Sequence, residues 1–222
     1  GESYLVGQDY LMRSDSYLDP TDYSVVASFR DGNAVRTEAV ESALSGAAGE
    51  KVIVDYRGEP VLSAWNPIDL PSGVRWAMMS EIDVAEAFVP KDARGAELYA
   101  QYIEEYGYYD LFLINPDGFI FYTVVHEPDY RTNIVDGTYS ESNLGQLTRQ
   151  VLATKEFGVV DFEPYAPSNN APAAFIAQPV VVSGEVEMVV ALQLPIEGVN
   201  AIMQERTGMG ETGETYLVGP DH

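Results

Sequence analysis

The sequence predicts an α+β protein of two consecutive modules, each with a central antiparallel sheet of about five strands that is flanked by helices. Three observations lead to this prediction. Short runs rich in Val, Ile, Tyr and Phe alternate with turn residues, which is typical of strands joined in hairpins. Stretches with apolar residues three and four positions apart lie between these runs and predict helices. The same order of elements occurs twice along the 222 residues.

The first module is predicted to span residues 1–88. Its predicted strands are Tyr4–Val6, Tyr10–Met12, Val52–Asp55, Val61–Trp65 and Val74–Ile82. The first two and the next two are each separated by turn residues and are expected to form hairpins. Thr37–Leu44 carries apolar residues at helical spacing and is followed by Gly46, so a helix is predicted between the hairpins.

A helix is predicted to join the modules within residues 89–107. It runs from Gly95 to Tyr106 and ends at Gly107, because glycine is the common residue just beyond a helix.

The second module is predicted to span residues 108–195 and repeats this order. Its predicted strands are Tyr109–Ile114, Phe119–Val125, Gly158–Phe162, Ala173–Val182 and Val186–Leu194. Asp117-Gly118 is a strong signal for a hairpin turn. Ser142–Leu152 predicts a helix, and Glu163–Pro172, with three prolines, predicts an irregular loop.

One stretch is present at both ends of the chain. Gly1 to Asp9 reads GESYLVGQD and Gly213 to Asp221 reads GETYLVGPD, so that seven of nine positions are identical. Self-similarity at a fixed offset is the signature of a repeat. We therefore expect the chain to span about one period of a longer repeat, with residues 196–222 forming an exit helix and the start of the next unit.

The charge balance excludes several classes of partner. The chain has 35 Asp and Glu against 12 Lys and Arg, for a net charge of −23. Such a surface repels phosphate backbones and anionic headgroups, so neither nucleic-acid binding nor membrane-surface binding is expected. The absence of cysteine excludes disulfides, thiol catalysis and Cys-based zinc sites. No apolar run approaches the roughly 18–20 residues of a membrane span.

Several stretches carry a resemblance to a known family. Four look like parts of its membrane-proximal module: Leu11–Ser16 (LMRSDS), Val61–Pro67 (VLSAWNP), Trp76–Asp83 (WAMMSEID) and Glu211–Asp221 (ETGETYLVGPD). Three look like parts of its membrane-distal module: Tyr109–Thr123, Asp129–Asn133 and Asp161–Ala177. With these, nearly the whole chain resembles the extracytoplasmic double-Cache (tandem PAS-like) sensor domains of bacterial methyl-accepting chemotaxis proteins and sensor histidine kinases. The proximal-type module comes first here, whereas the distal one comes first in the family.

The resemblance implies a sensor fragment of a bacterial transmembrane signalling receptor. It implies an extracytoplasmic location, periplasmic or extracellular, in an inner-membrane receptor whose parent chain is membrane-anchored. It implies recognition of a small polar solute, such as an amino acid or an organic acid, and relay of a conformational change. No cofactor and no metal are implied, and the fragment is expected to be a monomer or a weak homodimer.

The candidate ligand-binding residues lie in the second module. In PAS-like folds the ligand lies between the sheet and the long crossover. The resemblance therefore implies that the loop Asp129–Asn133 and the stretch Asp161–Phe175 face each other. An Arg can hold a carboxylate in a bidentate pair, an Asp can hold an ammonium group, and aromatic rings can enclose an apolar body. The candidates are Asp129, Tyr130, Arg131, Asn133, Asp161, Tyr165, Ser168 and Phe175. The alternative is a surface ion pair between Asp129 and Arg131, with Tyr165 and Phe175 in the core.

A second, weaker candidate is Arg13–Ser16 in the first module, for which a polar turn is the favoured interpretation. Trp65 and Trp76 are expected to be packing residues.

Catalytic motifs are absent, and the chain is predicted not to be an enzyme. His126 and His222 are its only histidines. No Ser lies in a Gly-x-Ser-x-Gly elbow, and there is no HExxH motif or phosphate-binding glycine loop. Asn115–Gly118 lacks the alternating acidic ligands of a calcium loop. A structural spacer module in a large acidic surface protein stays open as the alternative function, and an enzyme is the least favoured class.

The two ends of the repeat lead to two further expectations. Ile196–Arg206 runs into the second copy without a linker, so this exit helix is expected to relay the ligand signal. Gly1–Asp9 is expected to pair within the first module's sheet. Gly213–Asp221 is expected to be frayed or to bind a sheet edge of a neighbouring molecule.

Overall fold

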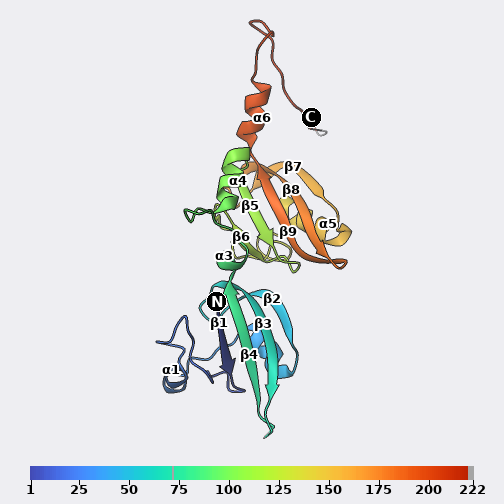
Figure 1. Ribbon diagram of the computed structural model, residues 1–222. Coiled ribbons are helices and arrows are strands. Elements are labelled where there is room, and N and C mark those ends of the chain that lie inside the picture. Colours follow the sequence, from blue (N-terminus) through green and yellow to red (C-terminus); the bar gives the residue numbers. More distant parts are fainter. Residues whose placement is uncertain (72, 220–222) are drawn as a thin grey trace. The chain divides into compact units, whose positions relative to one another are not determined.

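The computed structural model describes residues 1–71 and 73–219 and has an α+β architecture with two antiparallel sheets (Figure 1). The chain divides into two compact units, Gly1–Pro90 (unit 1) and Lys91–His222 (unit 2). Among the described residues, none of the helices combines the length and the apolar character that a membrane crossing requires.

The sheet of unit 1 has four strands in the order β1-β4-β3-β2. The strands are β1 (Glu2–Val6), β2 (Gly49–Val54), β3 (Pro60–Asp69) and β4 (Arg75–Asp83). The prediction of about five strands is wrong here, because Tyr10–Met12 contributes only the isolated bridge between Val6 and Met12. Tyr10 adopts a positive φ of 65°, which ends the extended conformation, and its N–H donates to the carbonyl oxygen of Gly7.

Three helices belong to unit 1: α1 (Val25–Asp31), α2 (Glu38–Ser45) and α3 (Val84–Ala87). Helix α2 confirms the predicted helix. The Thr37 hydroxyl accepts from Val40 N–H at its start, and Gly46 ends it with a φ of 103°. Its buried face packs in one core cluster with residues of the sheet. The sequence analysis did not predict α1 or α3, which have seven and four residues and too little periodicity to stand out.

The sheet of unit 2 has five strands in the order β6-β5-β9-β8-β7. The strands are β5 (Asp110–Ile114), β6 (Ile120–Thr123), β7 (Gly158–Tyr165), β8 (Ala171–Val182) and β9 (Glu185–Leu194). All five predicted strands of this part of the chain are present. Strand β5 is buried along its whole length, although it begins with a carboxylate.

The helices of unit 2 are α4 (Leu98–Tyr106), α5 (Asn143–Thr154) and α6 (Ile196–Met203). Helix α4 ends at Gly107 as predicted, with a φ of 72°. It lies beside the sheet of unit 2, with the Tyr99 ring centroid 5.8 Å from that of Tyr122. Helix α6 ends three residues before the predicted Arg206.

Helix α5 covers the sheet of unit 2 (Figure 1). Leu144, Leu147 and Val151 on one face are fully buried against Phe112 and Phe175 of the sheet in a single core cluster. A polar tie fixes the start of the helix: Asn143 Nδ2 donates to the carbonyl oxygens of Asp161 (3.0 Å) and Ala173 (2.7 Å), on β7 and β8.

Half of the predicted loop Glu163–Pro172 is strand instead, at its two ends. Strand β7 continues to Tyr165 and β8 begins at Ala171, which leaves a short turn in which Asn169 and Asn170 adopt positive φ. Pro164 and Pro172 are paired in the register, and this pairing needs no N–H donor from either residue. The prolines therefore shape the hairpin without preventing it.

The second copy of the repeat forms no strand over residues 213–219, and residues 220 and 221 lie outside the described part of the chain. The exposed fractions of Tyr216, Leu217 and Val218 are 71%, 71% and 60%.

Substitution of Gly145 by Ala is expected to destabilise unit 2, even though Ala favours helices by about 1 kcal/mol over Gly. A Cβ at this position would lie 2.4 Å from the Ser140 carbonyl oxygen and 2.7 Å from that of Ile134. We expect a loss of about 2 kcal/mol or more, as for other overpacked sites. Amide hydrogen exchange of Leu111–Leu113 measures this loss of unfolding free energy. The control is Gln150→Ala, on the exposed side of α5. Equal stability of Gly145→Ala and wild type would contradict this packing.

Candidate functional site

A group of polar side chains meets at one end of the sheet in unit 2. Asp110 at the start of β5 is paired in register with Gln193 of β9, which is paired with Phe175 of β8. The segment that follows β6 brings Glu127 and Asp129 to this place. We call the following set the acidic cluster: Tyr109, Asp110, Glu127, Asp129, Tyr165, Ser168 and Gln193.

Backbone contacts hold the segment after β6 in place. The N–H of Arg131 donates to the Ile120 carbonyl oxygen, and the N–H of Ile120 donates to that of Thr132. The Thr123 hydroxyl accepts from the N–H of His126 at 2.8 Å. His126 and Arg131 have positive φ values of 58° and 62°, so the chain turns sharply at both positions. The turns between them fix the backbone that carries Glu127 and Asp129.

Hydroxyl groups connect the carboxylates of the acidic cluster. Tyr165 Oη donates to Asp129 Oδ2 at 2.5 Å, and Ser168 Oγ donates to Glu127 Oε2 at 2.5 Å. Tyr109 Oη donates to Glu127 Oε1 at 2.8 Å. Gln193 Nε2 donates to Ser168 Oγ at 3.4 Å. These bonds connect the carboxylates of Glu127 and Asp129 to the strand ends and to the turn between β7 and β8.

Three acceptor atoms of the acidic cluster have no hydrogen-bond partner in the part of the chain that the structure describes. They are Asp110 Oδ2, Asp129 Oδ1 and Gln193 Oε1. Their side chains are buried, with exposed fractions of 0%, 0% and 4%. A buried acceptor without a donor costs about 1–3 kcal/mol, and more if it is charged. These atoms can accept hydrogen bonds from a donor such as water or an ammonium group.

In the described residues, hydroxyl and backbone N–H groups donate hydrogen bonds to these carboxylates. Among the described residues, no Lys, Arg or His side chain forms an ion pair with Asp110, Glu127 or Asp129. Asp110 Oδ1 is stabilised by three backbone N–H groups instead, those of Leu111, Val124 and Val125, at 2.7, 2.9 and 3.1 Å. No group of three or more His, Asp or Glu in the described residues has a geometry that suits a metal ion.

Burial raises the pKa values of the acidic cluster. Desolvation raises the pKa of Asp110 to about 7, against the lowering effect of its three N–H donors, and the nearby Asp129 adds to the rise. The pKa of Asp129 is raised by desolvation and by Glu127. The hydrogen bond to Glu127 raises the pKa of Tyr109 to about 12. A cation placed among these groups would reverse the shifts, because it stabilises the ionised carboxylates.

The structure brings four of the predicted site residues to this place: Asp129, Tyr165, Ser168 and Phe175. Asp129 does not form the surface ion pair that was the alternative interpretation, because it is fully buried against Tyr165. Tyr165 and Phe175 both belong to the buried core, as the alternative interpretation expected, and their rings pack edge-on with the centroids 4.9 Å apart.

The other four predicted residues do not contact the acidic cluster through their side chains. The Arg131 side chain is exposed, and its guanidinium carbon lies 5.1 Å from the centroid of the Tyr130 ring. Tyr130 stacks on His126 at 4.3 Å. Asn133 shapes its own loop, since its Oδ1 accepts from the N–H groups of Val135 and Asp136. Asp161 is exposed on β7.

Sequence reasoning missed Tyr109, Asp110, Glu127 and Gln193. A weak signal existed for two of them: Asp110 opens the otherwise apolar run DLFLI, and Gln193 interrupts the apolar run VVALQL. A polar residue in a buried strand needs a partner or a function. Nothing in the sequence distinguishes Glu127 from the many other carboxylates.

Asp110→Asn is expected to make unit 2 less sensitive to pH. The folded pKa of Asp110 is about 7 and an unfolded Asp titrates near 3.9, so folded unit 2 binds more protons between these values. The contribution of Asp110 to the unfolding free energy therefore decreases as pH rises from about 4 to about 7. Asp110→Asn should stabilise unit 2 at pH 8 by about 1–3 kcal/mol and have little effect at pH 4.

The measurement is amide hydrogen exchange of Leu111–Leu113 across this pH range. Trp65 and Trp76 both lie in unit 1, so their fluorescence reports on unit 1 separately. The control is Asp161→Asn, which changes an exposed carboxylate of the same unit. A uniform destabilisation by Asp110→Asn at both pH values would contradict the assignment.

No protein-family model matches the chain, and no curated protein matches it. Solved structures with a similar fold do exist. An extracellular ligand-binding receptor from Desulfohalobium retbaense aligns over 87% of this chain and 30% of its own, with 11% identity and a TM-score of 0.48. The periplasmic sensory domain of the Campylobacter jejuni chemoreceptor Tlp1 aligns over 76% and 58%, with 17% identity and a TM-score of 0.47.

A third structure is the ligand-binding domain of the Pseudomonas fluorescens chemoreceptor CtaA in complex with L-serine. It aligns over 88% of this chain and 72% of its own, with 14% identity and a TM-score of 0.44. The chain spans 30% and 58% of the lengths of the first two structures, and no residue role is transferred from any of the three. The structural neighbours are periplasmic and extracellular sensor domains of chemoreceptors and histidine kinases, the class that the sequence resembles.

Proposed function

We propose that unit 2 is the ligand-binding module of an extracytoplasmic sensor of the PAS-like, double-Cache kind, and that its acidic cluster binds a small solute with a cationic amino group. The observation that carries this proposal is the set of three buried acceptors without donors, Asp110 Oδ2, Asp129 Oδ1 and Gln193 Oε1. An ammonium group offers three N–H donors and one positive charge. It would therefore supply donors for the three acceptor atoms and a counter-charge for the carboxylates.

The geometry favours an amine or an amino acid over an organic acid. A carboxylate ligand needs a cation, and the side chain of the proposed clamp residue Arg131 is exposed, with its guanidinium near the Tyr130 ring. An organic acid would instead meet Asp110 and Asp129, which repel it. The net charge of −23 also attracts cations toward the protein before they bind.

Solvent reaches the acidic cluster on one side. Glu127 is half-buried and Tyr109 is 42% exposed, whereas Asp110 and Asp129 are fully buried. The two outer residues can meet an incoming ammonium group first, and the two inner carboxylates can then hold it in a region of low dielectric, where charge interactions are stronger. Tyr165 and Phe175, both fully buried, close the inner side of the cluster next to Asp129.

The cluster is placed so that binding can affect the exit helix. Gln193 belongs to β9, which ends at Leu194, and Pro195 directly precedes α6. A ligand that engages Gln193 Oε1 would shift the end of β9, and no linker separates that end from α6. Ligand binding can therefore change the population of two arrangements of this helix.

A thermal-shift screen tests the binding proposal with four classes of small molecule: amines, amino acids, organic acids and polyols. Only compounds with an amino group should raise the unfolding temperature, because a ligand specific to the native state stabilises it. Asp129→Asn should weaken the affinity for a hit at least about tenfold, as expected for a lost charged hydrogen bond. Arg131→Ala should change it less than about threefold, as for an exposed rim charge.

The same screen separates the alternatives. An organic acid that binds Asp129→Asn normally and loses affinity with Arg131→Ala would restore the carboxylate clamp and overturn the amine proposal. The absence of any hit would favour a structural spacer.

Hydrogen exchange with a saturating amine tests the relay. Exchange should slow in Asp161–Phe175 and change in Ile196–Met203, since β9 connects the acidic cluster to α6. Protection of Asp161–Phe175 with no change in Ile196–Met203 would show that the ligand binds without reaching the helix. Val25–Asp31 in unit 1 is the internal control, with unchanged exchange expected.

A further inference from the structure

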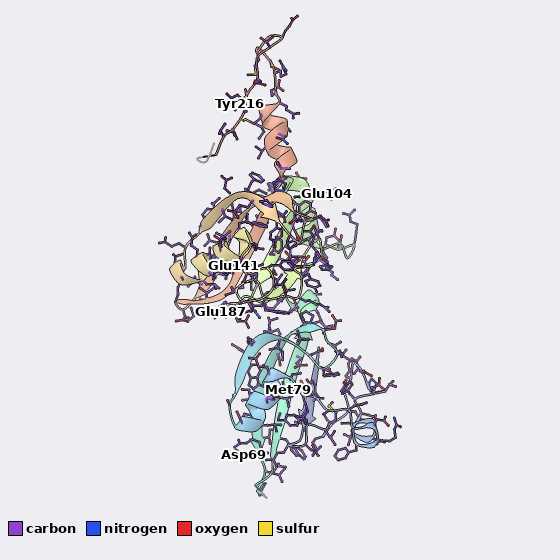
Figure 2. All side chains as sticks on the ribbon, turned by 180° about the vertical axis from the view of Figure 1, so that it is seen from behind. Asp69, Met79, Glu104, Glu141, Glu187 and Tyr216 are labelled. Carbon is purple, nitrogen blue, oxygen red and sulfur yellow. The ribbon has the colours of Figure 1, made fainter. Side chains whose placement is uncertain are left out.

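The two copies of the repeated stretch lie in different environments. In the first, β1 occupies the edge of β4, with Tyr4 and Val6 almost fully buried at 2% and 0% exposure. In the second, residues 213–219 are exposed, and no described residue pairs with their backbone as a strand would. Figure 2 labels Tyr216 in this segment, beyond the end of α6. The Tyr and Val side chains of the first copy are therefore in the core, whereas the corresponding Tyr216 and Val218 of the second copy are in solvent.

The edge of β4 makes specific contacts with β1. Tyr4 is paired with Met79, labelled in Figure 2, and Val6 is paired with Ala77. Tyr4 Oη donates to Glu81 Oε2 at 3.0 Å, within the core of unit 1. On the outer face, the hydroxyl groups of Ser3 and Ser80 lie 2.9 Å apart. These contacts specify the sequence of the strand that fits this edge.

Glu2 makes further contacts that a replacing strand would have to keep. Its carboxylate accepts from the hydroxyl groups of Ser16 (2.9 Å) and Tyr56 (2.5 Å) and from the N–H of Tyr17 (2.9 Å). It is also buried, with an exposed fraction of 8%. A strand without a carboxylate at this position would leave these donors unpaired.

The second copy carries every group that these contacts use. In the order of the first copy, Glu214 corresponds to Glu2, Thr215 to Ser3, Tyr216 to Tyr4, Leu217 to Leu5 and Val218 to Val6. Thr215 keeps the hydroxyl group, and its extra methyl group would lie on the exposed face. A strand with these residues can make the same register and the same buried contacts.

We propose that Gly213–Gly219 of one molecule replaces β1 at the edge of β4 in unit 1 of a second copy of this chain. Among the strands of the sheet, β1 pairs with β4, and its other side contacts the following segment through the Val6–Met12 bridge and the bond from Arg13 N–H to the Leu5 carbonyl oxygen. Its departure leaves the pairing of β4, β3 and β2 intact, and a replacing strand offers the same backbone groups. The exchange conserves the contacts and buries Tyr216 and Val218, which are otherwise exposed. Exchange of an identical element between copies is a low-cost route to association.

Tethering controls how often the exchange occurs. The resident β1 is part of its own unit and acts at an effective concentration in the millimolar range, as for short flexible connections. A strand from another molecule at micromolar concentration competes roughly a thousandfold less well, if the contacts are equal. The wild-type chain should therefore exchange in a small fraction of molecules, and a weakened β1 should raise this fraction.

Engineered cysteines in the full chain detect the exchange, because the natural sequence has no cysteine. Ser3 is paired with Ser80 and Leu5 with Met78, and all four side chains lie on the outer face of the sheet. Donor chains with Thr215→Cys or Leu217→Cys are mixed with acceptor chains that carry Ser80→Cys or Met78→Cys. Disulfide-linked dimers should form in the matched pairs 215–80 and 217–78, and at least about tenfold less in the mismatched pairs 215–78 and 217–80.

Substitution of Tyr4 in the acceptor chain provides the matched control. Tyr4→Ser removes a buried ring from β1 and should raise the yield of matched dimers at least about tenfold, since large-to-small changes in a core are strongly destabilising. Adding Tyr216→Ser to the donor should abolish this gain. If Tyr4→Ser unfolds unit 1, seen as lost Trp65 fluorescence, the register test in the wild-type background decides. Equal yields in matched and mismatched pairs, no dimer, or a disulfide within one molecule carrying both cysteines would overturn the proposal.

Discussion

The desolvation of Asp110 and Asp129 is the constraint on which the chemistry of unit 2 depends. Both carboxyl groups are fully buried and, within the described residues, neither has a basic partner. Hydroxyl and backbone donors satisfy only part of their hydrogen-bonding capacity. A fold selected only for stability would be expected to pair these groups or to replace them with apolar residues. These buried carboxylates therefore retain acceptor atoms without a donor in the described residues, and the proposed binding of an amino group rests on these atoms.

Gln193 of the acidic cluster lies close to the start of helix α6 along the chain. Asp110 and Gln193 face each other on β5 and β9 at the end of the sheet, and β9 passes directly into α6. Because strand and helix are consecutive in the chain, a change of position at Gln193 cannot be absorbed by a flexible linker. The proposed binding site and the proposed output helix are therefore connected by one short segment of backbone.

In unit 1, by contrast, the buried carboxylate of Glu81 has hydrogen-bond donors. Glu81 accepts from the hydroxyl groups of Ser63 (2.9 Å) and Tyr4 (3.0 Å), and no side-chain oxygen of this group is left without a donor in the described residues. Burial still raises the pKa of Glu81 to about 7. Its network joins β1, β3 and β4, so here the polar contacts fix the register of an edge strand. The contrast separates a structural network from the unsatisfied cluster in unit 2.

The sequence by itself determined the class of the fold and most of its elements. Signals that depend only on neighbouring residues led to correct predictions. They are the alternation of residue types in the strands, the hairpin turn at Asp117-Gly118, and the glycines that end α2 and α4. Tyr10–Met12 and the two ends of Glu163–Pro172 were predicted wrongly, because a positive φ at Tyr10 and a proline pair matched across two strands depend on contacts made elsewhere in the chain.

The site shows the same division. Of the residues predicted from the sequence, Asp129, Tyr165, Ser168 and Phe175 lie at the acidic cluster, whereas Arg131 was selected for its charge and lies with its side chain exposed. Only the tertiary structure placed Asp110 opposite Gln193 and brought Glu127 to Ser168, over separations of 83 and 41 residues. Residue types indicate which chemistry is available. Burial and strand register, which are properties of the whole fold, decide which carboxylates lack a partner.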